Sequence, residues 1–210
     1  MKKELILWIA HFARAYARSD WKKLKSLAGR VKTVGITSKQ LYELVLQGYL
    51  FLGFPAAIEA FTALDGTFKN PKETAERSPV WRVKKGEAFC RRIYREKYPI
   101  LMQSLQEKSP QLAGWIIEEG YGKVLSRRGA SLGLRELFSA ALLAASGFPK
   151  QLFAHLRALV EMGEKTEDLA LLVGEASVGL PKKTRSAVWK MVSLLLANRN
   201  SVWKVPVSSL

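Results

Sequence analysis

The sequence of 210 residues contains one cysteine, Cys90. A single cysteine excludes an internal disulfide bond, a paired-cysteine redox motif and a zinc site built on cysteine pairs. We therefore expect no metal and no cofactor, and a reducing compartment such as the cytoplasm. We expect Cys90 to pack as a small apolar side chain.

Long uncharged runs are also missing. The longest, residues 44–58, has 15 residues and contains Gly-Phe-Pro, whereas a membrane-spanning helix needs about 20 apolar residues. The apolar N-terminal stretch is interrupted by His11 and Arg14, and it lacks the small-residue cleavage site of a signal peptide. The sequence therefore predicts no membrane segment.

Acidic residues are scarce: 18 of them face 34 lysines and arginines, which gives a formal net charge of +16. Such a charge attracts nucleic acid, anionic lipid or carboxylate metabolites, or simply aids solubility. The basic residues form two clusters along the chain, one of Lys22, Lys23, Lys25, Arg30 and Lys32 and one of Arg91, Arg92, Arg95 and Lys97. No helix-turn-helix, zinc-finger or RNA-binding motif accompanies them. A solvated surface is the favoured interpretation, and nucleic-acid binding is the alternative.

Alternating patterns typical of strands are absent except over Ser201–Val207, whose state stays open. Elsewhere apolar residues recur at helical spacing, as they do over residues 3–18. Asp20 is suited to cap a second helix, and Thr37 and Gln40 form a capping box that predicts the start of a third. The sequence therefore predicts an all-α fold.

The breaks between helices are marked by glycine, proline and polar residues. Gly53-Phe54-Pro55 predicts a break followed by a helix over 56–64, because proline fits the first turn of a helix. The polar segment 65–85 predicts a linker. Three further helices are expected to follow it, over residues 87–95, 100–107 and 111–119. Gly120 is expected to end the last of them.

The order of helices repeats along the chain. Shifting the sequence by 128 residues places Gly35 on Gly163 and Leu41 on Leu169. Matched helix breaks arise by chance less easily than matched leucines, so we expect two tandem repeats that share one core. This divides the chain into a first repeat over 1–68, a linker with interposed helices over 69–130, and a second repeat over 131–210.

Three passages of the sequence resemble a known family. They are "ELVLQGYLFLGFPAAIEAF", "GYGKVLSRRGASLGLREL" and "AALLAASGFPKQLFAHLRALVEMG", and together they cover about half of the chain. They are similar to the carboxymuconolactone decarboxylase family and its alkylhydroperoxidase D-like relatives. The resemblance implies an all-helical fold of two tandem repeats of the alkylhydroperoxidase D-like type packed as one unit. It also implies a homo-oligomer.

The resemblance supplies a spacing for the active site. The peroxidase branch carries Glu, eleven residues, Cys, two residues, Cys, three residues and His, and this spacing is kept here by Glu136, Phe148, Gln151 and His155. Both sulfurs are missing, so the chain cannot attack a peroxide and resolve the product as those enzymes do. The decarboxylase branch, which lacks that requirement, implies that His155 transfers a proton with Glu136 as its partner.

Three further residues are candidates for substrate binding. Phe148 is expected to keep the pocket dry, Gln151 shares a helical face with His155, and Arg128 is a candidate for holding a substrate carboxylate. In the first repeat, Trp8 and Leu27 occupy the positions equivalent to Glu136 and His155. Only the second repeat can therefore hold the site.

Simpler interpretations of the pair stay open. Glu136 lies near a predicted helix start, where an acid stabilises the helix dipole and Ser131 can serve as the cap. A single histidine on a helix can also be packed without taking part in chemistry. The expected function is a carbon–carbon lyase, or a related acid/base enzyme, acting on a small carboxylated lactone or keto acid. The alternative is a helical scaffold that has lost the reaction.

Overall fold

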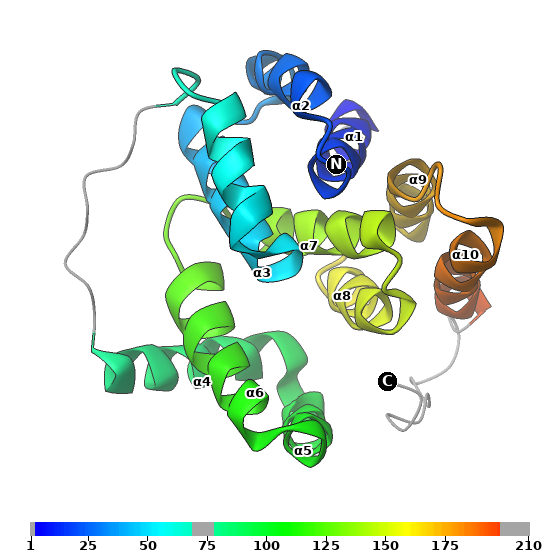
Figure 1. Ribbon diagram of the computed structural model, residues 1–210. Helices are drawn as coiled ribbons and strands as arrows, with labels where there is room; N and C mark the ends of the chain where they lie inside the picture. The colour runs from blue at the N-terminus through cyan, green and yellow to red at the C-terminus, as the bar shows by residue number, and fades with distance from the viewer. Residues whose placement is uncertain (1–2, 69–77, 198–210) are drawn as a thin grey trace. The chain divides into compact units, whose positions relative to one another are not determined.

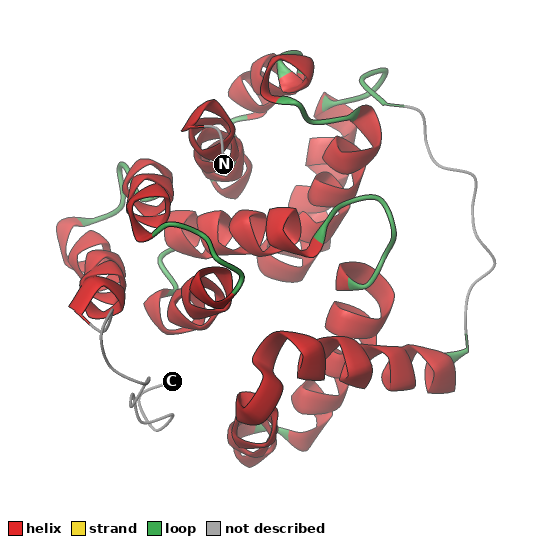
Figure 2. Ribbon diagram, turned by 180° about the vertical axis from the view of Figure 1, so that it is seen from behind, coloured by secondary structure: helices red, strands yellow, loops and turns green. Residues whose placement is uncertain are grey.

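The computed structural model describes residues 3–68 and 78–197. Every regular element in these ranges is a helix, and none of the described residues forms a strand (Figure 2). The prediction of an all-α fold is confirmed. The described residues fall into two compact units, unit 1 with residues 3–68 and 129–197 and unit 2 with residues 78–128. Ser201–Val207 lies outside the described residues.

The first half of unit 1 contains four helical elements, which are α1 (Lys3–Ala17), α2 (Trp21–Ala28), the 3₁₀-helix η1 (Val31–Val34) and α3 (Ser38–Ala63). The predicted caps are present: the Asp20 side chain accepts from the Lys23 backbone N–H at 3.0 Å. Thr37 and Gln40 form both hydrogen bonds of the capping box. These bonds satisfy amide groups that have no partner inside the helix.

The break predicted at Gly53 is also present. Gly53 has φ 79° and ψ 170°, so two helical segments meet there at a kink within α3. Pro55 begins the second segment, where its missing amide hydrogen is tolerated.

The second half of unit 1 contains α7 (Leu132–Ser146), α8 (Pro149–Glu161), α9 (Thr166–Ala176) and α10 (Lys182–Ala197). Helix starts in the two halves recur at a fixed interval: α2 begins at residue 21 and α8 at 149, while α3 begins at 38 and α9 at 166. The interval is 128 residues in both cases. Residues with positive φ recur at the same interval, at Ser19 and Gly147 and again at Gly35 and Gly163.

Helix α7 is the central helix of unit 1 (Figure 1). All twelve residues from Leu134 to Ala145 are buried, because α1, α3, α8 and α9 pack against different sides of the helix. Phe138 of α7 and Phe12 of α1 join the two halves, with ring centroids 6.0 Å apart. A helix covered on all sides is expected to be apolar all round. The three polar residues that α7 buries, Arg135, Glu136 and Ser139, depart from that expectation.

Unit 2 contains α4 (Pro79–Tyr94), the 3₁₀-helix η2 (Arg95–Lys97), α5 (Tyr98–Lys108), α6 (Pro110–Trp115) and the π-helix η3 (Ile116–Leu125). Helices α4 and η3 pack closely through two glycines. A Cβ on Gly86 would collide with the Ile117 carbonyl, and a Cβ on Gly122 would collide with the Arg82 carbonyl. Cys90 is buried on α4, as predicted.

Two boundary predictions in this region are wrong. The linker expected over 65–85 ends early, because Ser78 caps α4 by accepting from the Trp81 N–H and Pro79 occupies the first turn. Gly120 does not end a helix, since the chain continues through it as η3. Packing of η3 against α4 keeps this glycine helical despite its weak intrinsic preference.

One helix among the described residues, α3, is long and apolar enough to cross a membrane, with a mean hydropathy of 1.5 over its best window. A single helix of this kind is weak evidence for a membrane span, because core helices of soluble proteins can be as long and as apolar. The helix is longer than the 15-residue uncharged run in the sequence because it continues through Glu43 and Glu59 on either side.

Candidate acid/base site

Helices α7 and α8 form a hairpin that brings Glu136 and His155 together. Gly147 ends α7 in a left-handed conformation with φ 74°, and Pro149 lies in the first turn of α8. The two helices then run side by side, so that residues 19 positions apart in sequence meet. The Nδ1 atom of His155 lies 2.7 Å from Oε2 of Glu136. The hairpin thus brings together two side chains that lie 19 residues apart in the sequence.

The pair is almost fully removed from solvent. The Glu136 side chain is 1% exposed and the His155 side chain 11%. A carboxylate only accepts hydrogen bonds, so when Glu136 is ionised the proton between the two groups belongs to Nδ1 of His155. The second ring nitrogen, Nε2, makes no hydrogen bond to any described residue. This arrangement fixes the imidazole tautomer and leaves Nε2 for exchange with a ligand or water.

An aromatic ring from α3 lies beside the histidine. Phe51 meets the His155 ring edge to face, with centroids 6.3 Å apart and an interplanar angle of 66°. Such contacts restrict the rotation of a ring and exclude water from its neighbourhood. The first half of unit 1 therefore contributes a residue to the surroundings of a site whose polar groups come from the second half.

A second polar network lies on α7 next to Glu136, and sequence reasoning missed it. Arg135 donates to Glu43 of α3 at 2.8 Å and to the side chain of Gln47 at 3.2 Å. Gln47 in turn donates to the Arg135 carbonyl at 3.0 Å and to the Ser139 hydroxyl at 2.9 Å. All four residues are buried. The sequence signal was the placement of two polar residues, Glu43 and Gln47, at i and i+4 among the apolar residues 41–52.

The equivalent positions of the first half also meet, with different chemistry. The Trp8 indole N–H donates to the Leu27 carbonyl at 2.9 Å, which ties α1 to α2. The Trp8 ring stacks on Phe12, with centroids 4.8 Å apart. This contact is structural and holds no titratable group.

The predicted substrate residues are exposed, whereas Glu136 and His155 are buried. Phe148 precedes α8 and is 50% exposed, so its role in keeping a pocket dry stays a prediction. The ring is exposed because the turn at Gly147 places it at the tip of the hairpin. Gln151 is exposed one turn before His155, and Arg128 is exposed and belongs to unit 2.

Within the described ranges, no further charged side chain pairs with Glu136 or His155. Arg157 is buried, but its Nε lies 3.7 Å from Glu161 on its own helix. The described residues contain no group of three or more His, Cys, Asp or Glu side chains that could hold a metal ion.

The cluster of Lys22, Lys23, Lys25, Arg30 and Lys32 is exposed throughout on α2 and the residues that follow it. The apolar residues of α2, Leu24 and Leu27, face the core instead. The basic side chains therefore occupy the solvent side of this segment.

No protein-family model matches the chain, and no curated protein matches it either.

Proposed function

We propose that this chain is an acid/base enzyme of the carboxymuconolactone decarboxylase type, acting on a small carboxylated lactone or keto acid. The observation that carries the proposal is the 2.7 Å contact between His155 Nδ1 and Glu136 Oε2 in a buried setting. A carboxylate and an imidazole held in this way form a common proton-transfer unit in enzymes.

The duplicated architecture belongs to the same proposal. The 128-residue interval between helix starts and between left-handed residues supports two repeats of the alkylhydroperoxidase D-like type. In this interpretation the Trp8–Leu27 contact marks the equivalent place in a first repeat whose site is degenerate.

The chemistry requires one proton donor. Loss of CO₂ breaks a carbon–carbon bond and leaves the electron pair on a conjugated enolate. A protonated His155 delivers its Nε2 proton to carbon and becomes neutral, and Nε2 then regains a proton from solvent. Glu136 holds Nδ1–H throughout and stabilises the imidazolium form. Both groups remain on rigid helices, so little reorganisation accompanies the transfer.

Turnover measurements test this function. Purified protein is mixed with unsaturated lactone carboxylates and keto acids while CO₂ release is followed. On an active substrate, His155→Gln should lower kcat by about 100-fold or more, because general acid/base catalysis contributes that much. His11→Gln is the matched control, since His11 Nε2 lies 3.0 Å from Glu175 in a second His–Glu pair that is far more exposed. Equal rates for wild type and His155→Gln would remove the assignment.

We further propose that the protein is a homo-oligomer through the surface of α3 that follows the kink at Gly53. Phe54 is 68% exposed and Ile58 62% exposed, one helical turn apart on one surface. Large apolar side chains gathered in this way are typical of association sites. Light scattering after size exclusion should give a multiple of 23.5 kDa for wild type and a smaller mass for Phe54→Asp. A wild-type monomer contradicts this part of the proposal.

The exposed basic residues of α2 support nucleic-acid binding as a second candidate function. Phosphate contacts predict an affinity that falls steeply with salt. Retention on single-stranded and duplex DNA is therefore compared between wild type and the triple variant Lys22→Gln, Lys23→Gln, Lys25→Gln. Weaker retention of the variant supports the candidate, and the absence of wild-type binding at low salt rejects it.

A further inference from the structure

We propose that unit 1 carries a second ligand site, separate from the Glu136–His155 pair, that binds a small organic anion with a flat ring. The site is a cleft of about 600 Å³ on the first turns of α10. The cleft is open to solvent rather than enclosed. It is lined by Leu180, Lys182, Arg185, Ser186 and Trp189.

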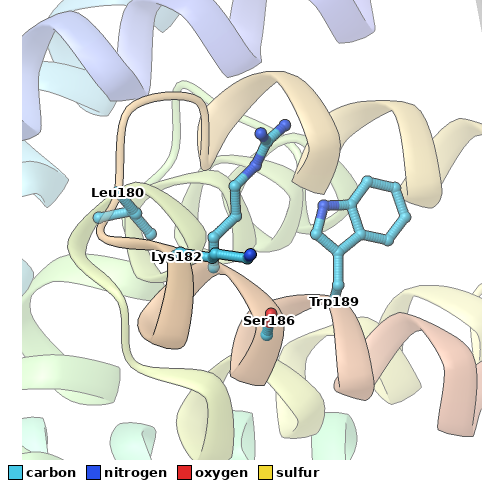
Figure 3. Close-up of a pocket in the computed structure, with 5 residues that line it drawn as sticks. Leu180, Lys182, Ser186 and Trp189 are labelled. Atoms are coloured by element: carbon cyan, nitrogen blue, oxygen red, sulfur yellow. The ribbon is translucent and has the colours of Figure 1, made fainter.

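Four of the five lining residues share one face of a helix. Lys182, Arg185, Ser186 and Trp189 stand at positions i, i+3, i+4 and i+7 of α10, which is the spacing of neighbours along a helical face. Figure 3 shows Lys182, Ser186 and Trp189 projecting from α10, with Leu180 on the loop before it. The helix thus presents two cations, a hydroxyl and an indole ring to the same space.

The chemistry of the lining selects an anion. Lys182 and Arg185 supply positive charge, Ser186 supplies a hydroxyl, and none of the described lining residues is an acid. Arginine and lysine side chains together are well suited to carboxylate or phosphate oxygens. The Trp189 ring, 37% exposed, offers a flat apolar surface beside these charges. A ring that bears a carboxylate or phosphate group would contact both the basic side chains and the Trp189 ring.

Arg185 carries an unsatisfied donor beside the cleft. Its Nε atom is buried and has no hydrogen-bond partner among the described residues. A buried donor without an acceptor destabilises a folded protein, and native structures rarely leave one unexplained. Because Nε is closed off from the cleft, an anion oxygen reaches it only if the Arg185 side chain turns toward the ligand.

The charges on the first turn of α10 also oppose local helix preference. Lys182 and Lys183 lie in that turn, Arg185 follows, and no acid balances them. Cations near a helix N-terminus are disfavoured by the helix dipole. Departures from local preference of this kind are concentrated at functional sites.

Trp189, the aromatic residue of the cleft, packs against a glycine of the neighbouring helix. A Cβ on Gly174 of α9 would lie 3.1 Å from Cζ2 of Trp189, so the absent side chain leaves room for the indole. Trp189 therefore rests against α9.

Binding measurements on the full chain test this site. Isothermal titration uses three probes, which are 4-hydroxybenzoate, adenosine monophosphate and inorganic phosphate. The first two share a flat ring and an anionic group but differ in the anion, so they distinguish a carboxylate ligand from a phosphate ligand. We expect one of them to bind more tightly than inorganic phosphate, because only they can also cover Trp189.

Variants then locate the binding. Arg185→Gln should weaken the bound probe by about tenfold or more, the usual effect of losing a charged hydrogen bond. Trp189→Leu should weaken the ring-bearing probe while leaving inorganic phosphate unchanged. Lys183→Gln is the matched control, because Lys183 is exposed beside Lys182 but does not line the cleft. His155→Gln should bind as wild type does, which separates this site from the proposed catalytic pair.

Two results would overturn the proposal. One is that neither ring-bearing probe binds the wild-type protein in the millimolar range. The other is that Lys183→Gln weakens binding as much as Arg185→Gln, which would assign the effect to overall charge. Thermal unfolding of each variant verifies that the helix is intact.

Discussion

Nδ1 of His155 and Oε2 of Glu136 lie 2.7 Å apart at the interface of α7 and α8, with the carboxylate 1% exposed. The contact therefore joins two helices as well as two titratable groups. A buried carboxylate is stable only while a donor faces it, so the pair contributes to folding and to the proposed chemistry at once. Substitutions can therefore be chosen that separate the contribution of the pair to folding from its proposed role in proton transfer.

Removing the histidine alone should destabilise the protein strongly. His155→Leu leaves the Glu136 carboxylate buried without its donor, a change that lowers the free energy of unfolding by about 3 to 5 kcal/mol in comparable pairs. The double variant Glu136→Leu, His155→Leu should recover a large part of that loss, because no buried charge remains. Urea unfolding of the single and double variants measures the difference.

The exposed pair of His11 and Glu175 provides the control. These side chains are 32% and 38% exposed, so His11→Leu should change the unfolding free energy by no more than about 1 kcal/mol. If the double variant at Glu136 and His155 is less stable than His155→Leu, the carboxylate is not the source of the loss.

The pairing was predicted through the spacing that the family resemblance supplies, and local signals for a turn permit it. Gly147 and Pro149 mark the hairpin, and helical periodicity sets the faces of Glu136 and His155. The caps at Asp20 and Thr37 were predictable for the same reason. Each signal lies within a few residues of the feature it determines.

Contacts between distant segments could not be predicted in this way. Arg135 meets Gln47 and Glu43 across 88 and 92 residues, and nothing local in the sequence indicates which helix faces α7. Gly120 looks like a helix end, but it lies within the π-helix that packs on α4. The exposure of Phe148 likewise depends on how the hairpin sits in unit 1.

The Arg135–Glu43 ion pair gives a second prediction about buried charge. The two side chains are 1% and 2% exposed, and the Arg135 Nη2 to Glu43 Oε2 distance is 2.8 Å. Arg135→Met should lower the unfolding free energy by about 3 kcal/mol or more, since it leaves the Glu43 side chain buried without its ion-pair partner. Arg135→Lys should also be destabilising, because an ammonium cannot reproduce the planar contacts to Glu43 and Gln47.

Chemical denaturation compares these variants with Lys123→Met, which removes an exposed ion pair to Glu119 at 3.5 Å. The control should lose no more than about 0.5 kcal/mol. A stability of Arg135→Met equal to that of the control would mean that the buried pair adds nothing to folding.

Gly48 should not tolerate a side chain. A Cβ at this position would lie 2.6 Å from Cζ of Tyr16, so Gly48→Ala must displace the ring or separate α1 from α3. Overpacking of this kind destabilises by about 1 to 3 kcal/mol. Alanine has a higher helix preference than glycine, and on that ground alone Gly48→Ala would stabilise the protein by up to about 1 kcal/mol. The sign of the measured change therefore shows whether the clash or the helix preference dominates.

Gly133→Ala on α7 is the control for that experiment, because no atom lies within 4 Å of the added Cβ. It should leave the melting temperature equal or raised. A raised melting temperature for Gly48→Ala would show that the contact between Gly48 and Tyr16 is not close in solution.

Tyr16 should make the stability of unit 1 sensitive to alkali. Burial raises the pKa of the Tyr16 phenol, whose O–H donates to the Val45 carbonyl at 3.0 Å. An unfolded tyrosine ionises near pH 10, and the folded protein resists that ionisation. The raised pKa of Tyr16 therefore contributes fully to the stability of the folded protein below about pH 10. This contribution is lost as the pH rises from there toward the folded pKa, because only the unfolded state releases the phenol proton in that range.

Urea unfolding at several values between pH 8 and pH 11 measures this effect in wild type and in Tyr16→Phe. At pH 8 the variant should be less stable by about 1 kcal/mol, the usual contribution of one hydrogen bond. Above pH 10 the difference in unfolding free energy between the two proteins should become smaller, because phenylalanine has no proton to lose. Lysines and the other tyrosines titrate equally in both proteins. Parallel curves across the whole range would mean that the Tyr16 phenol is no harder to ionise in the folded protein than in the unfolded chain.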